Sequence, residues 1–299
     1  MQFSFWPNPN QSISDLFKLV DHVEASGWSG VWYADHFMPN QQDSSGPTHE
    51  AFTVLAALAV RTTRLRIGSL VAGNTYRHPA VLAKMAATID HLSNGRMVLG
   101  LGSAWQENEH MQYGIPFHDI PGRLARLNEA CAVITSLFSQ EKSDFEGEYY
   151  QLKQACLAPK PIQKPLPLLI GGGGEKVTLK ITARYANEWN VWGTPDLLRQ
   201  KMQVLDAHCE RIKRDPEEIR RSTQALLFMS VDENQLKKFR DLKLQLPTII
   251  GTPDRVTEIV ADYAKAGVDE LIIPDFNLGG VQNAMQTMDV FMQQVIANV

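Results

Sequence analysis

Eight short apolar runs alternate with longer segments of helical periodicity along the chain. The runs lie at residues 2–6, 30–35, 65–72, 96–102, 167–171, 188–192, 223–230 and 270–275. Most of them are apolar along their whole length, which is typical of parallel strands that are buried on both faces. Because a helical segment follows each run, the pattern predicts repeated βα units. This alternation restricts the chain to a small set of α/β architectures.

Two α/β architectures accommodate eight βα units. A (β/α)8 TIM barrel typically uses about 250 residues, and this chain has 299. An open doubly wound sheet is the alternative, but eight regular units would make such a sheet very wide. We therefore predict an α/β protein with a (β/α)8 TIM barrel that forms a single domain over residues 1–299. The segment 140–167 has no clear periodicity and is predicted to be an insertion between the fourth helix and the fifth strand.

Three hydroxyl side chains mark predicted helix starts. Ser14, Thr194 and Thr252 stand where N-cap residues belong, and proline follows each of the two threonines. An N-cap hydroxyl accepts a hydrogen bond from an amide of the first turn, and proline at the first helical position has no amide hydrogen to leave unpaired.

Charge and cysteine content disfavour several classes of protein. The formal net charge of -4 argues against nucleic acid or an anionic membrane surface as the main partner. The three cysteines have no CxxC spacing, so they indicate neither a disulfide framework nor a zinc site. The first residues, MQFSFWPNPNQ, do not resemble a signal peptide, and the longest apolar run, AFTVLAALAV, has about half the ~20 residues needed to cross a bilayer. We predict a soluble cytoplasmic protein that binds no metal.

The active site of a TIM barrel lies at the carboxyl ends of its strands. The residues that follow each run are therefore the candidates for function, and here they include many aromatic side chains and few charges. The aromatic residues at these positions are Trp6, Phe37, Trp105, Trp192 and Phe276. Such a lining suits a flat, conjugated ligand held by stacking and a few hydrogen bonds. We predict that these aromatic residues bind a small-molecule substrate.

Four consecutive glycines, Gly171 to Gly174, connect the fifth run to the next helical segment. Bare amides at a helix N-terminus form a concave donor surface with a favourable dipole, which suits a phosphate. The sequence GGGGEK lacks both the ending of a Walker loop and the third glycine of a dinucleotide fingerprint. Two interpretations remain: a phosphate cradle of another kind, or a tight turn between strand and helix.

Asp35 and His36 end the second run and are candidates for proton transfer. Histidine changes its charge near neutral pH, and a neighbouring carboxylate can bias its charge state. The structural alternative is a histidine that is hydrogen-bonded at the strand end, beside an aspartate that caps a turn.

Glu107 and His110 form an ExxH pair, which is half of a di-iron helix motif. The sequence has no second copy of this pair, so we interpret the segment as the solvated start of a helix.

The strand-end motifs together resemble the luciferase-like monooxygenase superfamily, in particular its branch that uses the deazaflavin coenzyme F420. The resemblance covers nearly the whole chain. Its most specific stretches are GSLVAGNTYRHP, GLGSAWQENEHMQYGIPF and PKPIQKPLPLLIGGGGEKVTLKITARYANEWN. It implies a luciferase-like TIM barrel, an F420-dependent oxidoreductase and a homodimer.

The resemblance also implies roles for individual residues. Asp35 would hydrogen-bond the deazaflavin ring, and His36 would act as acid or base. A cis peptide bond in the third strand, at Ser69–Leu70 or Leu70–Val71, would back the ring. The remaining implied cofactor contacts are Gly102, Ser103, Asn108, Gly171, Gly172, Gly173, Gly174 and Glu175. Some sugar-phosphate dehydrogenases of the group carry a catalytic glutamate where this chain has Trp105.

The implied reaction is hydride transfer between F420 and a small organic substrate, with His36 handling the compensating proton. Three alternatives use different chemistry. A luciferase-like monooxygenase would use reduced FMN and oxygen, a carrier protein would bind a flavin or deazaflavin without catalysis, and an aldolase- or isomerase-like barrel would use only the phosphate cradle. No lysine clearly follows a run to form a Schiff base, which disfavours the last alternative.

Overall fold

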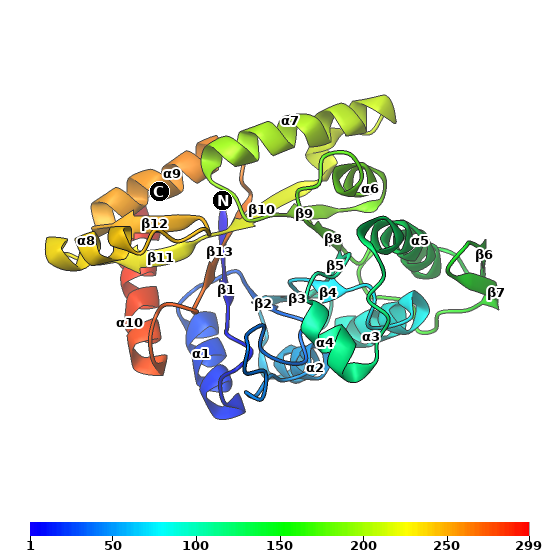
Figure 1. The fold of residues 1–299 in the computed structure, drawn as a ribbon, viewed down its shortest axis with the longest axis horizontal. Coiled ribbons are helices and arrows are strands. Elements are labelled where there is room, and N and C mark those ends of the chain that lie inside the picture. The colour runs from blue at the N-terminus through cyan, green and yellow to red at the C-terminus, as the bar shows by residue number, and fades with distance from the viewer. Residues whose placement is uncertain (299) are drawn as a thin grey trace.

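Eight parallel strands form a closed barrel in the computed structural model, which describes residues 1–298 (Figure 1). The barrel strands are β1 (Gln2–Trp6), β2 (Gly30–Tyr33), β3 (Arg66–Ser69), β5 (Met97–Gly102), β8 (Leu168–Gly171), β9 (Glu188–Asn190), β10 (Arg220–Gln224) and β13 (Glu270–Pro274). Each strand pairs in parallel with the next one along the chain. The last strand, β13, pairs with β1, so the sheet closes on itself. The predicted (β/α)8 TIM barrel is confirmed, and the open sheet is wrong.

Most of the helices surround the barrel and cover the outer faces of its strands, whereas α4 lies against the His36–Phe37 segment and α8 packs on β11 (Leu226–Met229) and β12 (Thr248–Gly251) (Figure 1). They are α1 (Ile13–Ala25), α2 (Ala51–Arg61), α3 (Pro79–Leu92), α4 (Glu107–Tyr113), α5 (Ile120–Ser139), α6 (Thr178–Tyr185), α7 (Pro195–Arg211), α8 (Glu233–Asp241), α9 (Pro253–Lys265) and α10 (Val281–Val290). A π-helical turn (Phe291–Val295) and two 3₁₀ turns (Pro216–Glu218 and Ile296–Asn298) complete the helical structure. Over residues 1–298, no helix has the length and apolar character that a membrane span requires.

The predicted caps of α7 and α9 are confirmed, because the hydroxyls of Thr194 and Thr252 accept hydrogen bonds from amides of the first turn. The prediction for Ser14 is wrong by two residues. Ser12 has the extended backbone of an N-cap, and its hydroxyl accepts from the Asp15 amide at 3.1 Å. Ser14 lies within the first turn of α1, where its own backbone is already helical.

Two apolar layers stabilise the barrel. The larger layer lies between the strands and the surrounding helices and contains most of the buried leucine, isoleucine, valine and alanine side chains. The smaller layer fills the barrel interior and consists of Trp6, Trp32, Ala34, Leu70, Val98, Leu169 and Ile272. Because side chains pack the interior, any ligand must bind above this layer, at one end of the barrel.

A network of charged groups occupies the opposite end, where the strands begin. The fully buried Glu270 carboxylate accepts hydrogen bonds from Ser4 Oγ at 2.5 Å and from Trp32 Nε1 at 2.8 Å. Arg66 and Arg220, which open β3 and β10, donate to the same carboxylate at 2.8 and 3.1 Å. A buried carboxylate is tolerated only when it is paired and hydrogen-bonded. This network therefore secures the amino-terminal end of the barrel.

Several elements were not predicted. They are the strands β6 (Ser143–Glu146), β7 (Gln151–Ala155) and β12 (Thr248–Gly251), and the helix α8. The helix α4 begins at Glu107, where the ExxH pair indicated a helix start. The run 65–72 was predicted as one strand, but it is divided between β3 and β4 (Ala72–Gly73), and β11 (Leu226–Met229) is part of the run 223–230. The run 223–230 was predicted as one strand, but it leaves the barrel after Gln224, and its second half pairs with β12 in a separate sheet.

The segment 140–167 lies between α5 and β8, as predicted, but it contains an antiparallel hairpin of β6 and β7 (Figure 1). The hairpin is polar, so its periodicity is weak. Its turn is held by Glu129 of α5, whose carboxylate accepts hydrogen bonds from the amides of Glu148, Tyr149 and Tyr150. A contact with another element therefore stabilises structure that the local sequence did not reveal.

Candidate active site

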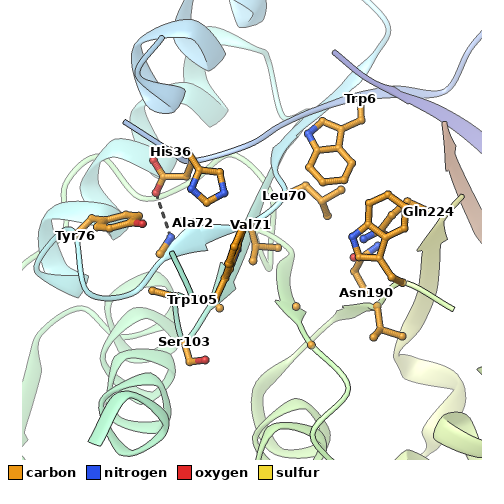
Figure 2. A pocket seen from close by; sticks show the side chains of 18 residues that line it. Trp6, His36, Leu70, Val71, Ala72, Tyr76, Ser103, Trp105, Asn190 and Gln224 are labelled. Atoms are coloured by element: carbon orange, nitrogen blue, oxygen red, sulfur yellow. Dashed lines mark hydrogen bonds between the residues drawn. The ribbon is translucent and has the colours of Figure 1, made fainter. Parts of the chain in front are cut away.

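A cavity of about 530 Å³ opens at the carboxyl ends of the barrel strands. Figure 2 shows that the labelled residues that line it come from several barrel strands and from the segments that follow them. The predicted site residues that line it are Trp6, Asp35, His36, Leu70, Val71, Gly102, Ser103, Trp105, Gly171, Gly172 and Trp192. Its volume lies in the range of small-molecule sites in proteins.

Other predicted site residues lie outside this lining. They are Phe37, Ser69, Asn108, Gly173, Gly174, Glu175 and Phe276. Ser69 is fully buried and exchanges hydrogen bonds with the backbone of Gly100, and the Asn108 amide donates to the Pro39 carbonyl at 3.1 Å. Phe37 packs against Tyr76, with ring centroids 4.8 Å apart.

Phe276 contacts the ring of Trp6 at a centroid distance of 5.0 Å and is partly exposed. Phe276 therefore contacts a residue of the cavity lining without lining the cavity itself.

The peptide bond between Leu70 and Val71 is cis, which decides between the two positions that the resemblance implied. Both side chains line the cavity at the point where β3 gives way to β4. The neighbouring strand β5 makes room for this segment with glycine. A Cβ atom at Gly100 would lie 2.0 Å from the Ser69 carbonyl oxygen, and one at Gly102 would lie 2.8 Å from the Val71 side chain. The glycines of β5 thus allow the Leu70–Val71 segment to form part of the cavity floor.

Asp35 is buried beside the cavity and pairs with Arg77. The guanidinium donates two hydrogen bonds to the carboxylate, at 2.8 and 3.0 Å, and the Gly73 amide donates a third at 3.1 Å. Burial raises the pKa of Asp35, and the charge of Arg77 opposes this shift. Arg77 also contacts Glu50 at 2.5 Å, so it is held between two acidic residues.

His36 contacts a carboxylate that lies far away in the sequence. Its Nδ1 is 2.9 Å from Oε1 of Glu109, which is fully buried on α4. Glu109 also accepts hydrogen bonds from the Phe37 amide at 2.7 Å and from the Tyr76 hydroxyl. Burial acts to raise the pKa of Glu109, but the hydrogen bonds from His36, Phe37 and Tyr76 outweigh it and lower the pKa. A carboxylate that accepts from Nδ1 leaves Nε2 as the nitrogen available to a ligand.

The prediction that the ExxH segment is a solvated helix start is wrong for its histidine. His110 is fully buried, and its two ring nitrogens contact Thr75 Oγ1 at 2.6 Å and the Gln106 carbonyl oxygen at 2.7 Å. Glu107 is exposed, and the buried acid of this segment is Glu109. Within the described part of the chain, no three histidine, cysteine or acidic residues are grouped as metal ligands.

The glycine loop continues from the cavity wall onto the surface. Gly172 has a φ of +120° that favours glycine, and its carbonyl accepts from the Trp189 indole at 2.9 Å. Within residues 1–298, the amides of Gly173, Gly174 and Glu175 donate no hydrogen bond to another backbone group. The α6 helix begins only at Thr178, so these amides belong to the loop that precedes it.

A lysine that was not predicted lies beside this loop. The Lys201 side chain of α7 passes next to Gly173, and its Nζ lies 2.7 Å from Glu175 Oε1. The free amides and the Lys201 ammonium suit an anionic group, whereas the Glu175 carboxylate, which is paired with Lys201, opposes one.

The cavity lining also includes residues that sequence reasoning missed. They are Ala72, Gly73, Tyr76, Ala104, Asn190, Val191 and Gln224. Asn190 and Gln224 are polar residues inside apolar runs, and this contrast was the one available signal for them. Tyr76 stands in the loop after the third run, and only its contact with Glu109 shows its place in the site.

Asp275 follows β13 at the same end of the barrel, and burial raises its pKa to about 6. The folded protein therefore holds this proton more tightly than the unfolded chain does. The resulting stabilisation is complete below about pH 4 and is lost as the pH rises to about 6. Asp275→Asn should remove this dependence, so that between pH 4 and 7 the variant gains about 3 kcal/mol of unfolding free energy relative to wild type. Urea unfolding of both proteins at several pH values measures the difference. The same change of unfolding free energy with pH in both proteins would contradict the prediction.

Comparison with known proteins identifies relatives by sequence. A sequence model described as luciferase-like monooxygenase matches residues 1–243. An F420-dependent glucose-6-phosphate dehydrogenase from Amycolatopsis mediterranei (strain U-32) is 36% identical over 173 residues, which are 58% of this chain and 50% of that protein. This chain spans about half the length of the curated relatives that it matches most strongly.

Solved structures share the fold over the whole chain. The coenzyme F420-dependent tetrahydromethanopterin reductase from Methanopyrus kandleri matches with a TM-score of 0.83 and 19% identity, over 99% of this chain and 98% of that one. An F420-dependent secondary alcohol dehydrogenase, solved with an F420–acetone adduct, matches with a TM-score of 0.86 and 18% identity, over 100% of this chain and 99% of that one.

Proposed function

This chain belongs to the luciferase-like monooxygenase family, and on that premise we propose that it is a coenzyme F420-dependent oxidoreductase that transfers a hydride between the deazaflavin and a small organic substrate. The observation that carries the proposal is that one cavity joins the Leu70–Val71 segment, His36 and the start of the glycine loop. Relatives named as F420-dependent enzymes, at 36 and 38% identity, favour F420 over FMN.

The residues around the cavity suit the two chemically distinct parts of this cofactor. The ring would lie on the surface made by Leu70 and Val71 and the glycines beside them, with Asp35 at its edge. The anionic tail would extend along the glycine loop, where Gly173, Gly174 and Glu175 have free amides and Lys201 supplies a positive charge. In this proposal Ser103 contacts the cofactor from the end of β5, whereas Ser69 and Asn108 act indirectly, through the backbone segments that they hold.

When bound, F420 supplies or accepts a hydride at a substrate carbon. The protein orients the two reactants, excludes water and moves the proton that balances the reaction. His36 Nε2 would give this proton to the substrate oxygen or take it, while Glu109 holds the ring through Nδ1. Trp6, Trp105 and Trp192 would hold the substrate by stacking. The homodimer and the cytoplasmic location stay predictions.

Titration of the protein with F420 and with FMN tests the choice of cofactor. We expect saturable binding of F420, seen as a change in its fluorescence, and weaker binding of FMN. Tight binding of FMN without binding of F420 would support a flavin-dependent monooxygenase instead.

In the same assay, Lys201→Ala should raise the Kd for F420 by about tenfold, the effect of losing roughly 1.4 kcal/mol from a charge-assisted contact. Lys237→Ala on α8, which removes a surface lysine far from the loop in the sequence, is the matched control and should leave the Kd unchanged.

A further inference from the structure

Trp6 and Gln224 both point into the barrel at its upper layer. Trp6 ends β1 and lies opposite Pro274 of β13, whereas Gln224 ends β10 and lies opposite Ile272 of the same strand. Since side chains alternate across a strand, the two-residue step from Ile272 to Pro274 keeps both positions on the inner face. Figure 2 shows the two side chains on the same side of the cavity, whereas Tyr76 lies on the other side. They therefore form one wall of the proposed substrate site.

Each of these side chains has a buried polar atom without a partner in residues 1–298. The two atoms are Trp6 Nε1, which is a donor, and Gln224 Oε1, which is an acceptor. Both residues are more than nine-tenths buried. Leaving such atoms unpaired is unfavourable, and buried polar groups almost always have hydrogen-bond partners in folded proteins. Two such atoms, on residues that line one cavity, indicate that a ligand completes their hydrogen bonds.

Among the described residues that line the same cavity, none is a lysine or an arginine, the side chains that most often pair with a phosphate. The nearby guanidinium of Arg77 is already held by Asp35 and Glu50. A phosphorylated substrate would have to bring two negative charges into this site without a cation to pair with them, which is strongly unfavourable.

We propose that Trp6 and Gln224 bind an uncharged oxygen group of the substrate, a hydroxyl or a carbonyl, in addition to the oxygen that reacts beside His36. A hydroxyl accepts from the Trp6 indole and donates to the Gln224 amide, and a carbonyl accepts from Trp6 and from the NH₂ group of the same amide. The substrate class is thus a neutral alcohol or ketone with a second oxygen function, and not a sugar phosphate. This assignment rests on the proposed function, because the reacting oxygen beside His36 is inferred from the proposed hydride transfer.

The test compares trans-1,4-cyclohexanediol with cyclohexanol, which differ by one hydroxyl. Binding is followed by quenching of tryptophan fluorescence, since Trp6, Trp105 and Trp192 line the cavity. It is measured with and without F420. We expect the wild-type protein to bind the diol about tenfold more tightly, the effect of about two additional hydrogen bonds. Glucose 6-phosphate should bind no more tightly than glucose.

Three variants locate the effect. Gln224→Met keeps the side-chain volume, and Trp6→Phe keeps an aromatic ring, so both should fold while reducing the preference for the diol toward unity. Trp192→Phe removes an indole N–H that is not among the unpartnered buried atoms, so it should keep the preference. Equal or absent binding of the two alcohols by wild type, an unchanged preference in both Gln224→Met and Trp6→Phe, or tighter binding of glucose 6-phosphate than of glucose would each overturn the proposal.

The cofactor titration separates this proposal from the proposed function. Binding of F420 without a preference for the diol would leave the function in place and overturn the role of Trp6 and Gln224. A preference for the diol in a protein that does not bind F420 would support the oxygen-binding pair and count against the function.

Discussion

Replacing His36 with alanine is expected to lower kcat by about 10²- to 10⁴-fold, which is the usual contribution of a positioned general acid or base. The affinity for F420 should stay close to that of wild type, because His36 is only one of the residues that line the cavity and the anionic tail would bind elsewhere. Steady-state kinetics with a substrate found by screening alcohols and ketones, together with F420 titration, measures the two quantities separately. An unchanged kcat would remove His36 from the mechanism.

Two further variants support the interpretation of that result. His91→Ala removes an exposed histidine near the end of α3 and should leave kcat unchanged. Glu109→Gln keeps the shape of the carboxylate, but an amide cannot accept from His36, Phe37 and Tyr76 as well as two carboxylate oxygens do. We expect a smaller loss of kcat than in His36→Ala, because the imidazole is still present but less well oriented. If Glu109→Gln had the kcat of wild type, Glu109 would have only a packing role beneath the site.

Replacing Glu270 with alanine is expected to lower the free energy of unfolding by about 3 to 5 kcal/mol, the usual cost of removing one partner from a buried ion pair. The substitution leaves Ser4 Oγ, Trp32 Nε1 and the Arg220 guanidinium without their shared acceptor at the amino-terminal end of the barrel. Urea unfolding followed by circular dichroism measures the change. Cofactor binding by the folded fraction should persist, because the network lies at the end of the barrel away from the cavity.

Glu258→Ala is the matched control for this prediction. Glu258 also accepts from an arginine, Arg255, but both side chains are largely exposed. Exposed ion pairs contribute about 0 to 1 kcal/mol, so this substitution should change the unfolding free energy by less than about 1 kcal/mol. Similar losses in the two variants would mean that burial does not set the energy of the Glu270 network.

Most of the barrel could be predicted from the sequence, because the burial of each strand and helix determines the spacing of apolar residues within it. A strand buried on both faces is apolar throughout, and a helix on its outer side is apolar at every third or fourth residue. The residues of runs such as 96–102 and 167–171 therefore indicated by themselves that these runs are buried strands. The β6–β7 hairpin and α8 lack such a spacing, because the hairpin is polar and α8 buries only Leu236.

The position of the candidate site followed from the same pattern, since a closed parallel barrel brings all strand ends to one mouth. The sequence therefore indicated Trp6, Asp35 and His36 before any contact was known. Their partners could not be predicted. Glu109 lies 73 positions from His36, and Arg77 lies 42 positions from Asp35.

The sequence by itself determined the barrel, the strand ends that face its mouth and the loop of bare glycine amides, because periodicity and residue type are local properties. Only the tertiary structure decided which carboxylate holds His36, which cation neutralises Asp35, and that Trp6 and Gln224 share one wall with unpaired polar atoms. These pairings depend on distances between side chains on different strands and helices. The closure of the barrel and the packing of the helices around it set those distances.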